Sequence, residues 1–225
     1  MIKAVLFDLD GTLLNRDESL KCFINNQYER LKKWVGHIPK DQYMKRFIEL
    51  DNRGYVWKDK VYQQLTKEFH ITNLTWRELL DDYRGEFRYN CVPFDQVIQT
   101  LDELKSSGIR LGMITNGYGQ FQMENIKALG IESYLDVILI SEWEGIKKPD
   151  PDIFKKDLNR LHVLPEQSVF VGDHPINDVQ AAKSLGMTGV WKKDPQWEKV
   201  VADYTISDLK ELPFCIKALT SIDAD

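Results

Sequence analysis

Several features that mark special classes of protein are scarce in this 225-residue sequence. It has three cysteines, far apart and without a C-x-x-C pair, so we expect free thiols in a reducing compartment rather than a disulfide framework. No apolar run approaches the roughly 18 residues of a membrane span, and the first apolar stretch ends at Asp8. No basic stripe accompanies the net charge of -5. We therefore expect a cytoplasmic protein that binds neither membrane nor nucleic acid.

The composition that is present is ordinary for a globular protein, with 43% hydrophobic and 29% charged residues. The length suits one core domain with a smaller inserted module. Residues 16–90 carry aromatic and charged side chains at helical spacing without a convincing buried strand, which predicts three or four amphipathic helices. We predict that residues 1–15 and 91–225 form the core and that 16–90 form the inserted helical domain.

Short apolar, β-rich runs alternate with helical patterns in the predicted core. This alternation predicts an α/β fold, with a Rossmann-like parallel sheet covered by helices on both faces, plus an inserted α-helical bundle. A helix is expected over about 176–185, and Pro213 is expected to break a C-terminal helical segment. The predicted strands are 2–7, 109–114, 136–140, 168–171, 188–191 and 203–206.

Polar clusters follow these strands, at the edge where parallel sheets bind ligands. Asp8-Leu9-Asp10 continues the first strand, and residues two apart in an extended chain point to the same side. Two such carboxylates can bind a hard cation or divide nucleophile and acid/base roles. A lone D-x-D is more often a solvated turn, but here three further clusters join it.

Thr115-Asn116-Gly117 ends the second strand and offers a hydroxyl, an amide and an open backbone N–H to a phosphoryl group. Taken alone, it is equally well explained as a helix N-cap. Lys147-Lys148-Pro149 places a lysine beside a proline, where its ammonium can act as a point charge on phosphate.

The last cluster runs from Val171 to Asp178. Its Asp173 ends a strand as Asp8 does, and the two carboxylates together suit Mg²⁺, which also keeps waters and substrate phosphate. His174 invites a metal-ligand role, but a loop-shaping role is the better interpretation.

These four clusters, in this order, resemble the motifs of the haloacid dehalogenase superfamily of hydrolases. The resemblance covers essentially the whole chain and rests on Asp8-Leu9-Asp10-Gly11-Thr12, Thr115, Lys148, and Asp173 with Asp178. The helical insertion resembles the family's cap domain.

The resemblance implies a Mg²⁺-dependent phosphatase acting on a small phosphorylated metabolite. Asp8 would be the nucleophile that forms an aspartyl phosphate, and Asp10 the acid and base. Asp8, the carbonyl of Asp10 and Asp173 would hold the metal. The phosphoryl group would be held by Thr115, Asn116 and Lys148, and Asp178 would either orient Lys148 or complete the metal shell.

Alternatives stay open at this point. Lys147 could replace Lys148, although the Lys-Pro match favours the latter. Asp10 argues against a dehalogenase, because halide needs no protonation, while a phosphomutase or a non-catalytic binder of phosphorylated ligands remains an alternative. Asn15, Arg16 and Arg53 are candidate substrate contacts in or beside the cap. The oligomeric expectation is a monomer or homodimer.

Overall fold

The computed structural model describes residues 1–222, and the chain divides into two compact units. One unit joins Met1–Asn15 to the chain from Pro93 onward, and the other is Arg16–Val92. The helical unit thus ends at Val92, where the sequence suggested residue 90. Two segments of the core unit connect it to the helical unit, and they are bonded to each other. Leu14 forms an antiparallel bridge with Pro93, and Phe94 N–H donates to the Leu13 carbonyl at 2.9 Å.

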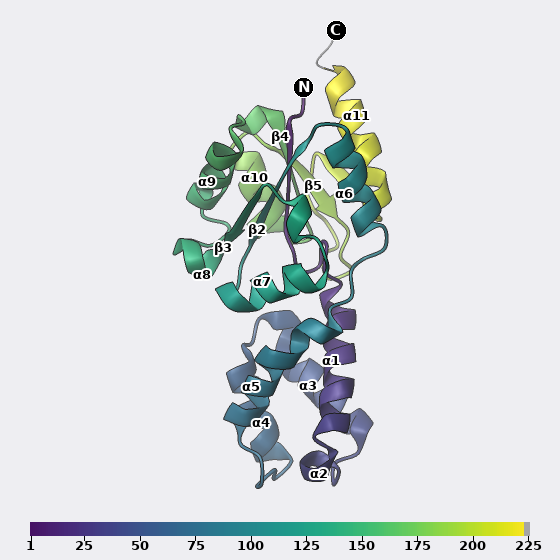
Figure 1. Ribbon diagram of the computed structural model, residues 1–225, viewed down its shortest axis with the longest axis vertical. Coiled ribbons are helices and arrows are strands. Elements are labelled where there is room, and N and C mark those ends of the chain that lie inside the picture. Colours follow the sequence, from purple (N-terminus) through teal and green to yellow (C-terminus); the bar gives the residue numbers. More distant parts are fainter. Residues whose placement is uncertain (223–225) are drawn as a thin grey trace. The chain divides into compact units, whose positions relative to one another are not determined.

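A six-stranded, wholly parallel sheet is the centre of the first unit (Figure 1). Its order is β3-β2-β1-β4-β5-β6, so the chain winds outward from β1 in one direction and then in the other. The predicted strands and the α/β class are confirmed. The strands are β1 (Ala4–Phe7), β2 (Arg110–Thr115), β3 (Val137–Ile140), β4 (Ser168–Gly172), β5 (Thr188–Lys192) and β6 (Tyr204–Ile206).

Helices cover both faces of this sheet, because strands buried on both sides expose apolar side chains in each direction. Figure 1 shows α9 and α10 on one side of the strands and α6 and α11 on the other. Leu6, Phe154 and Phe170 belong to the core cluster on the α9 side. The helices of this unit are α6 (Val97–Ser106), α7 (Gly119–Ala128), α8 (Ser141–Glu144), α9 (Pro151–Leu161), α10 (Ala181–Ser184) and α11 (Leu212–Ile222).

Two local predictions need correction. The helix expected over about 176–185 is present, but its first part, Pro175–Gln180, is a π-helix, and the single turn of α10 follows it. Such wide turns often occur at functional sites, and this one follows the strand end that carries Asp173. Pro213 does not break α11 but lies in its first turn, where a missing N–H removes no helical hydrogen bond.

The second unit contains four helices of eleven to fifteen residues and the one-turn α2. Aromatic rings fill its interior; Phe23 and Tyr83, for example, meet edge to face with centroids 5.1 Å apart. The buried Asp51 joins three helices, because Arg16 and Lys58 both donate to its carboxylate. The helices are α1 (Arg16–Arg30), α2 (Lys32–Val35), α3 (Lys40–Asp51), α4 (Lys58–Glu68) and α5 (Trp76–Glu86). None of the helices within residues 1–222 combines the length and apolar character that crossing a membrane requires.

One carboxyl group is buried without a hydrogen-bond partner among the described residues. Asp157 on α9 is fully buried, and neither of its oxygens has a hydrogen-bond partner among the described residues. It packs against β2 so closely that a Cβ on Gly112 would lie 2.6 Å from Asp157 Oδ1. Burial raises the pKa of Asp157 well above its ordinary value, against the opposing effect of Arg160, so folding favours the neutral form of this carboxyl group.

We therefore expect Asp157→Asn to stabilise the protein more at pH 8 than at pH 5. Above the ordinary aspartate pKa of about 3.9, the unfolded chain releases this proton while the folded chain retains it. Stability is then lost as the pH rises, by at most about 1.4 kcal/mol per pH unit, until the folded-state pKa is passed. Asparagine does not titrate, so the gain in melting temperature should grow with pH. Asp152→Asn, at an exposed position of the same helix, is the control, and a pH-independent difference for Asp157→Asn would contradict the assignment.

Candidate active site

Three strand ends meet where the direction of winding reverses. β1 lies between β2 and β4, so Asp8 directly after β1 is flanked by Thr115 at the end of β2 and Asp173 just beyond β4. Ligands of open parallel sheets bind at this switch point. The fold therefore brings together the strand-end clusters seen in the sequence.

Asp8 is buried and accepts hydrogen bonds from two side chains. It is 7% exposed, and its Oδ1 accepts from Lys148 Nζ at 2.6 Å while Oδ2 accepts from Thr12 Oγ1 at 3.5 Å. Burial raises the pKa of Asp8 to about 7, although Lys148 acts in the opposite direction. A second cation would favour the ionised form, which is the nucleophilic form of a carboxyl group.

Lys148 carries the positive charge of the site. It is 3% exposed, and its Nζ also donates to Asp178 Oδ1 at 2.7 Å. Burial by itself lowers the pKa of this lysine, but the carboxylates of Asp178 and Asp8 more than reverse that effect and raise it above the ordinary value. Lys147 is exposed, so the geometry favours Lys148 as the lysine of the site.

Asp178 has a protein partner on each oxygen. Oδ1 accepts from Lys148, and Oδ2 accepts from His174 N–H at 3.0 Å. This arrangement favours an orienting role toward Lys148. His174 in turn accepts at Nδ1 from the N–H groups of Ile176 and Asn177, both at 3.1 Å, which caps the π-helical turn and fits the loop-shaping interpretation.

Asp173 completes a set of carboxylates suited to a cation. One oxygen from each of Asp8, Asp173 and Asp178 lies within 4.8 Å of the others. Burial, and then the charge of Asp8, raises the pKa of Asp173 to about 9. Hard oxygen donors that repel one another at this separation fit Mg²⁺. A Cβ on Gly11, whose φ is +83°, would lie 2.4 Å from Asp173 Oδ2, so only glycine lets the Asp10–Gly11 backbone approach that carboxylate.

The side chain of Asn116 is used within the protein. Its Nδ2 donates to the Lys148 carbonyl and its Oδ1 accepts from Lys148 N–H, both at 2.9 Å. This pair of bonds fixes the backbone from which Lys148 extends. The backbone of Asn116, rather than its side chain, remains the candidate phosphate donor.

Sequence reasoning missed two buried polar residues. Gln122 on α7 donates from Nε2 to Asp10 Oδ2 and to Thr115 Oγ1, both at 2.7 Å. Lys192, the last residue of β5, donates to the Gly11 carbonyl at 3.1 Å. A lysine ending a buried strand was a readable signal for Lys192, whereas nothing in the helical pattern distinguished Gln122 from its neighbours.

The candidate substrate contacts have different surroundings. Arg16 and Arg53 belong to the helical unit, where Arg16 Nη2 is 2.9 Å from Asp51 Oδ2 and Arg53 Nη2 is 3.8 Å from Asp17 Oδ2. Arg53 has a φ of 55°, in the left-handed region that favours glycine. Asn15 is the last residue of the first core segment.

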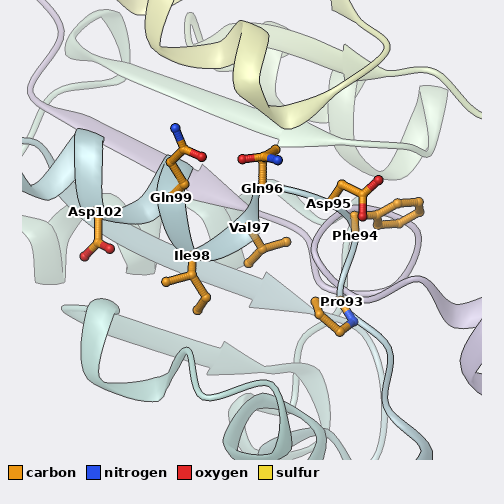
Figure 2. A pocket seen from close by; sticks show the side chains of 8 residues that line it. All are labelled: Pro93, Phe94, Asp95, Gln96, Val97, Ile98, Gln99 and Asp102. Carbon is orange, nitrogen blue, oxygen red and sulfur yellow. The ribbon is translucent and has the colours of Figure 1, made fainter.

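A pocket of about 560 Å³ lies over the first turn of α6 (Figure 2). Its wall includes Phe94, and Lys192 Nζ lies 3.2 Å from the centroid of the Phe94 ring. The strand-end carboxylates do not line it, so it is separate from the site described above. It is lined by Pro93, Phe94, Asp95, Gln96, Val97, Ile98, Gln99 and Asp102.

Comparison with known proteins identifies the family of this chain. The sequence profile described as "Haloacid dehalogenase-like hydrolase" matches residues 5–192, which include every strand-end cluster. The chain belongs to this family. The family expected from the motifs is therefore confirmed.

Individual relatives cover most of the chain. A glyceraldehyde 3-phosphate phosphatase of Pyrococcus furiosus is 32% identical over 94% of this chain and 91% of its own length. A phosphoglycolate phosphatase of Salmonella typhimurium is 32% identical over 84% of this chain and 80% of its own. The solved structure of a HAD phosphatase from Thermococcus onnurineus is 32% identical, with a TM-score of 0.68 over 96% of this chain and 98% of that one.

Magnesium should stabilise the folded protein through Asp173. A ligand at 100 times its dissociation constant adds about 2.7 kcal/mol, or roughly 5–10 °C in melting temperature for a chain of this size. We expect thermal-shift measurements to show this rise for wild type, its loss in Asp173→Asn, and its retention in Asp178→Asn. An equal loss in both variants would instead make Asp178 a metal ligand.

Proposed function

We propose that this protein is a Mg²⁺-dependent phosphatase that hydrolyses a small phosphorylated metabolite through an aspartyl phosphate. The observation that supports this most directly is the pairing of two carboxylates with different surroundings. Asp8 is buried against Lys148, whereas Asp10 is hydrogen-bonded by the neutral amide of Gln122. Such a difference in surroundings lets one carboxylate act as nucleophile and the other as acid and base.

In the first half-reaction, Asp8 attacks phosphorus and the bond from phosphorus to the leaving oxygen breaks. Asp10 gives its proton to that oxygen. In the second, a water molecule attacks the phosphorus of the aspartyl phosphate, Asp10 accepts its proton, and Asp8 is released. Lys148 and the Thr115 hydroxyl would hold the transferring phosphoryl oxygens, with the backbone of Asn116.

The carboxylates of Asp8 and Asp173 and the carbonyl of Asp10 would hold the metal ion. When bound, Mg²⁺ supplies positive charge that offsets repulsion between the carboxylate nucleophile and the anionic substrate. The raised pKa values of Asp8 and Asp173 support this assignment, because two adjacent buried carboxyl groups favour a cation between them.

Two compounds are the first substrates to test, because two relatives are named as phosphatases of these compounds. Glyceraldehyde 3-phosphate and phosphoglycolate are both short phosphomonoesters bearing a second polar group. We propose a substrate of this size. The helical unit, as the family's cap, would contribute selectivity, with Asn15, Arg16 and Arg53 as candidate contacts. The presence of Asp10 favours phosphatase over dehalogenase chemistry.

A phosphate-release screen tests the proposal. With Mg²⁺, we expect hydrolysis of one or more short phosphomonoesters, including the two above, and reversible loss of activity in EDTA. Undiminished hydrolysis in EDTA would refute the metal role. No release across several dozen phosphoesters would refute the phosphatase and favour a non-catalytic binder.

Substitution of Asp8 and substitution of Asp10 should block different steps of the reaction. Asp8→Asn should abolish activity, because no aspartyl phosphate can form. Asp10→Asn should lower turnover about 100-fold or more, while still allowing phosphorylation by a substrate with a good leaving group. Acid-quenched protein incubated with labelled substrate should therefore retain label in Asp10→Asn and not in Asp8→Asn. Wild-type turnover by Asp10→Asn would contradict its assignment.

A further inference from the structure

We infer that Gln122 is a positioning residue that fixes the Asp10 carboxylate for proton transfer to the leaving group and from water. The inference rests on the phosphatase function proposed above and adds a residue that no motif marks. Gln122 lies on α7, the helix that follows Thr115-Asn116-Gly117, and it is 2% exposed.

Hydrogen bonding fixes the orientation of the Gln122 amide. A carboxylate only accepts hydrogen bonds, so the contact at 2.7 Å from Asp10 Oδ2 requires the Nε2 end of the amide. At the other end, Oε1 accepts from Asn125 Nδ2 at 3.2 Å, one turn further along α7. Turning the amide over would set oxygen against carboxylate and NH₂ against NH₂. The amide therefore has one favourable orientation.

Gln122 Nε2 has two close acceptors, Asp10 Oδ2 and Thr115 Oγ1, both at 2.7 Å. The Asn116 carbonyl is a third, weaker acceptor at 3.4 Å. Because Thr115 Oγ1 accepts from Nε2, the single hydroxyl proton of Thr115 stays available as a donor to a phosphoryl oxygen. One buried amide thus connects the acid/base group with the group expected to hold the phosphoryl.

Backbone packing fixes the position of the Gln122 side chain. A Cβ on Gly117 would lie 2.8 Å from Gln122 Cγ, so the glycine of this segment provides the space that Gln122 occupies. The backbone of Gly119 is fixed too, through its N–H bond to Glu142 Oε2 at 2.6 Å, and α7 begins there. A carboxylate held this way keeps one rotamer, which a general acid needs at the moment of transfer.

Gln122→Met tests this role, because methionine has nearly the same shape and lacks the amide donor. The matched control is Gln120→Met, since Gln120 lies on the same helix but is exposed and pairs with Glu124. Each variant is assayed with p-nitrophenyl phosphate, whose leaving group needs little protonation, and with alkyl phosphates, whose leaving groups require it. Melting temperatures of the full-length variants establish that each is folded.

For Gln122→Met we expect kcat/KM to fall about 10- to 100-fold with alkyl phosphates and less than about 3-fold with p-nitrophenyl phosphate. Water activation should slow as well, so p-nitrophenolate should appear in a burst matching the enzyme concentration before slow turnover. Gln120→Met should resemble wild type with both substrates. Gln122→Leu, which also lacks the amide donor and is smaller than methionine, should show the same leaving-group dependence and covers the case in which the methionine variant does not fold.

An equal fall in kcat/KM for both substrate types would overturn the inference, because it would indicate a general effect on phosphate binding or folding. Wild-type kinetics in both Gln122 variants would overturn it too. These results leave the phosphatase proposal intact. Inactivity of the wild-type enzyme itself toward every phosphoester would refute the phosphatase, and the role of Gln122 with it.

Discussion

The contact on which the site depends is that of one buried ammonium with two buried carboxylates. Lys148 Nζ lies 2.6 Å from Asp8 and 2.7 Å from Asp178, in a region nearly free of solvent. Charges removed from water are tolerable when they are paired and fully hydrogen-bonded. The ammonium is paired with both carboxylates, and the second oxygen of Asp178 accepts from His174 N–H. The Asn116 side chain fixes the backbone from which Lys148 extends.

This cluster would carry surplus negative charge if all its carboxyl groups were ionised. Asp8, Asp173 and Asp178 place three carboxyl groups around one lysine, and burial raises the pKa of both Asp8 and Asp173. A site with surplus negative charge attracts cations and repels an anionic substrate. In a phosphatase the metal would reverse this local charge, so metal binding and phosphate binding would be favourably linked.

Much of this arrangement could be predicted because the decisive residues end apolar runs. Asp8 and Asp173 directly follow buried strands and Thr115 ends one, and parallel strands gather their carboxyl ends at one edge of the sheet. Gln122 could not be predicted this way, since a polar residue on a half-buried helix carries no pattern of its own. Pro213 was misinterpreted because proline favours a helix start and a helix stop about equally at the sequence level.

The bridge between Leu14 and Pro93 has a consequence for how such proteins can change. The core itself brings the two ends of the inserted unit together, and the Phe94–Leu13 hydrogen bond keeps them in register. The residues of the insert therefore do not have to supply the free energy that brings its two ends together. Domains whose ends lie side by side can be exchanged as units. One catalytic framework could in this way accept different helical modules, and so different metabolites, without alteration of the strands that carry its aspartates.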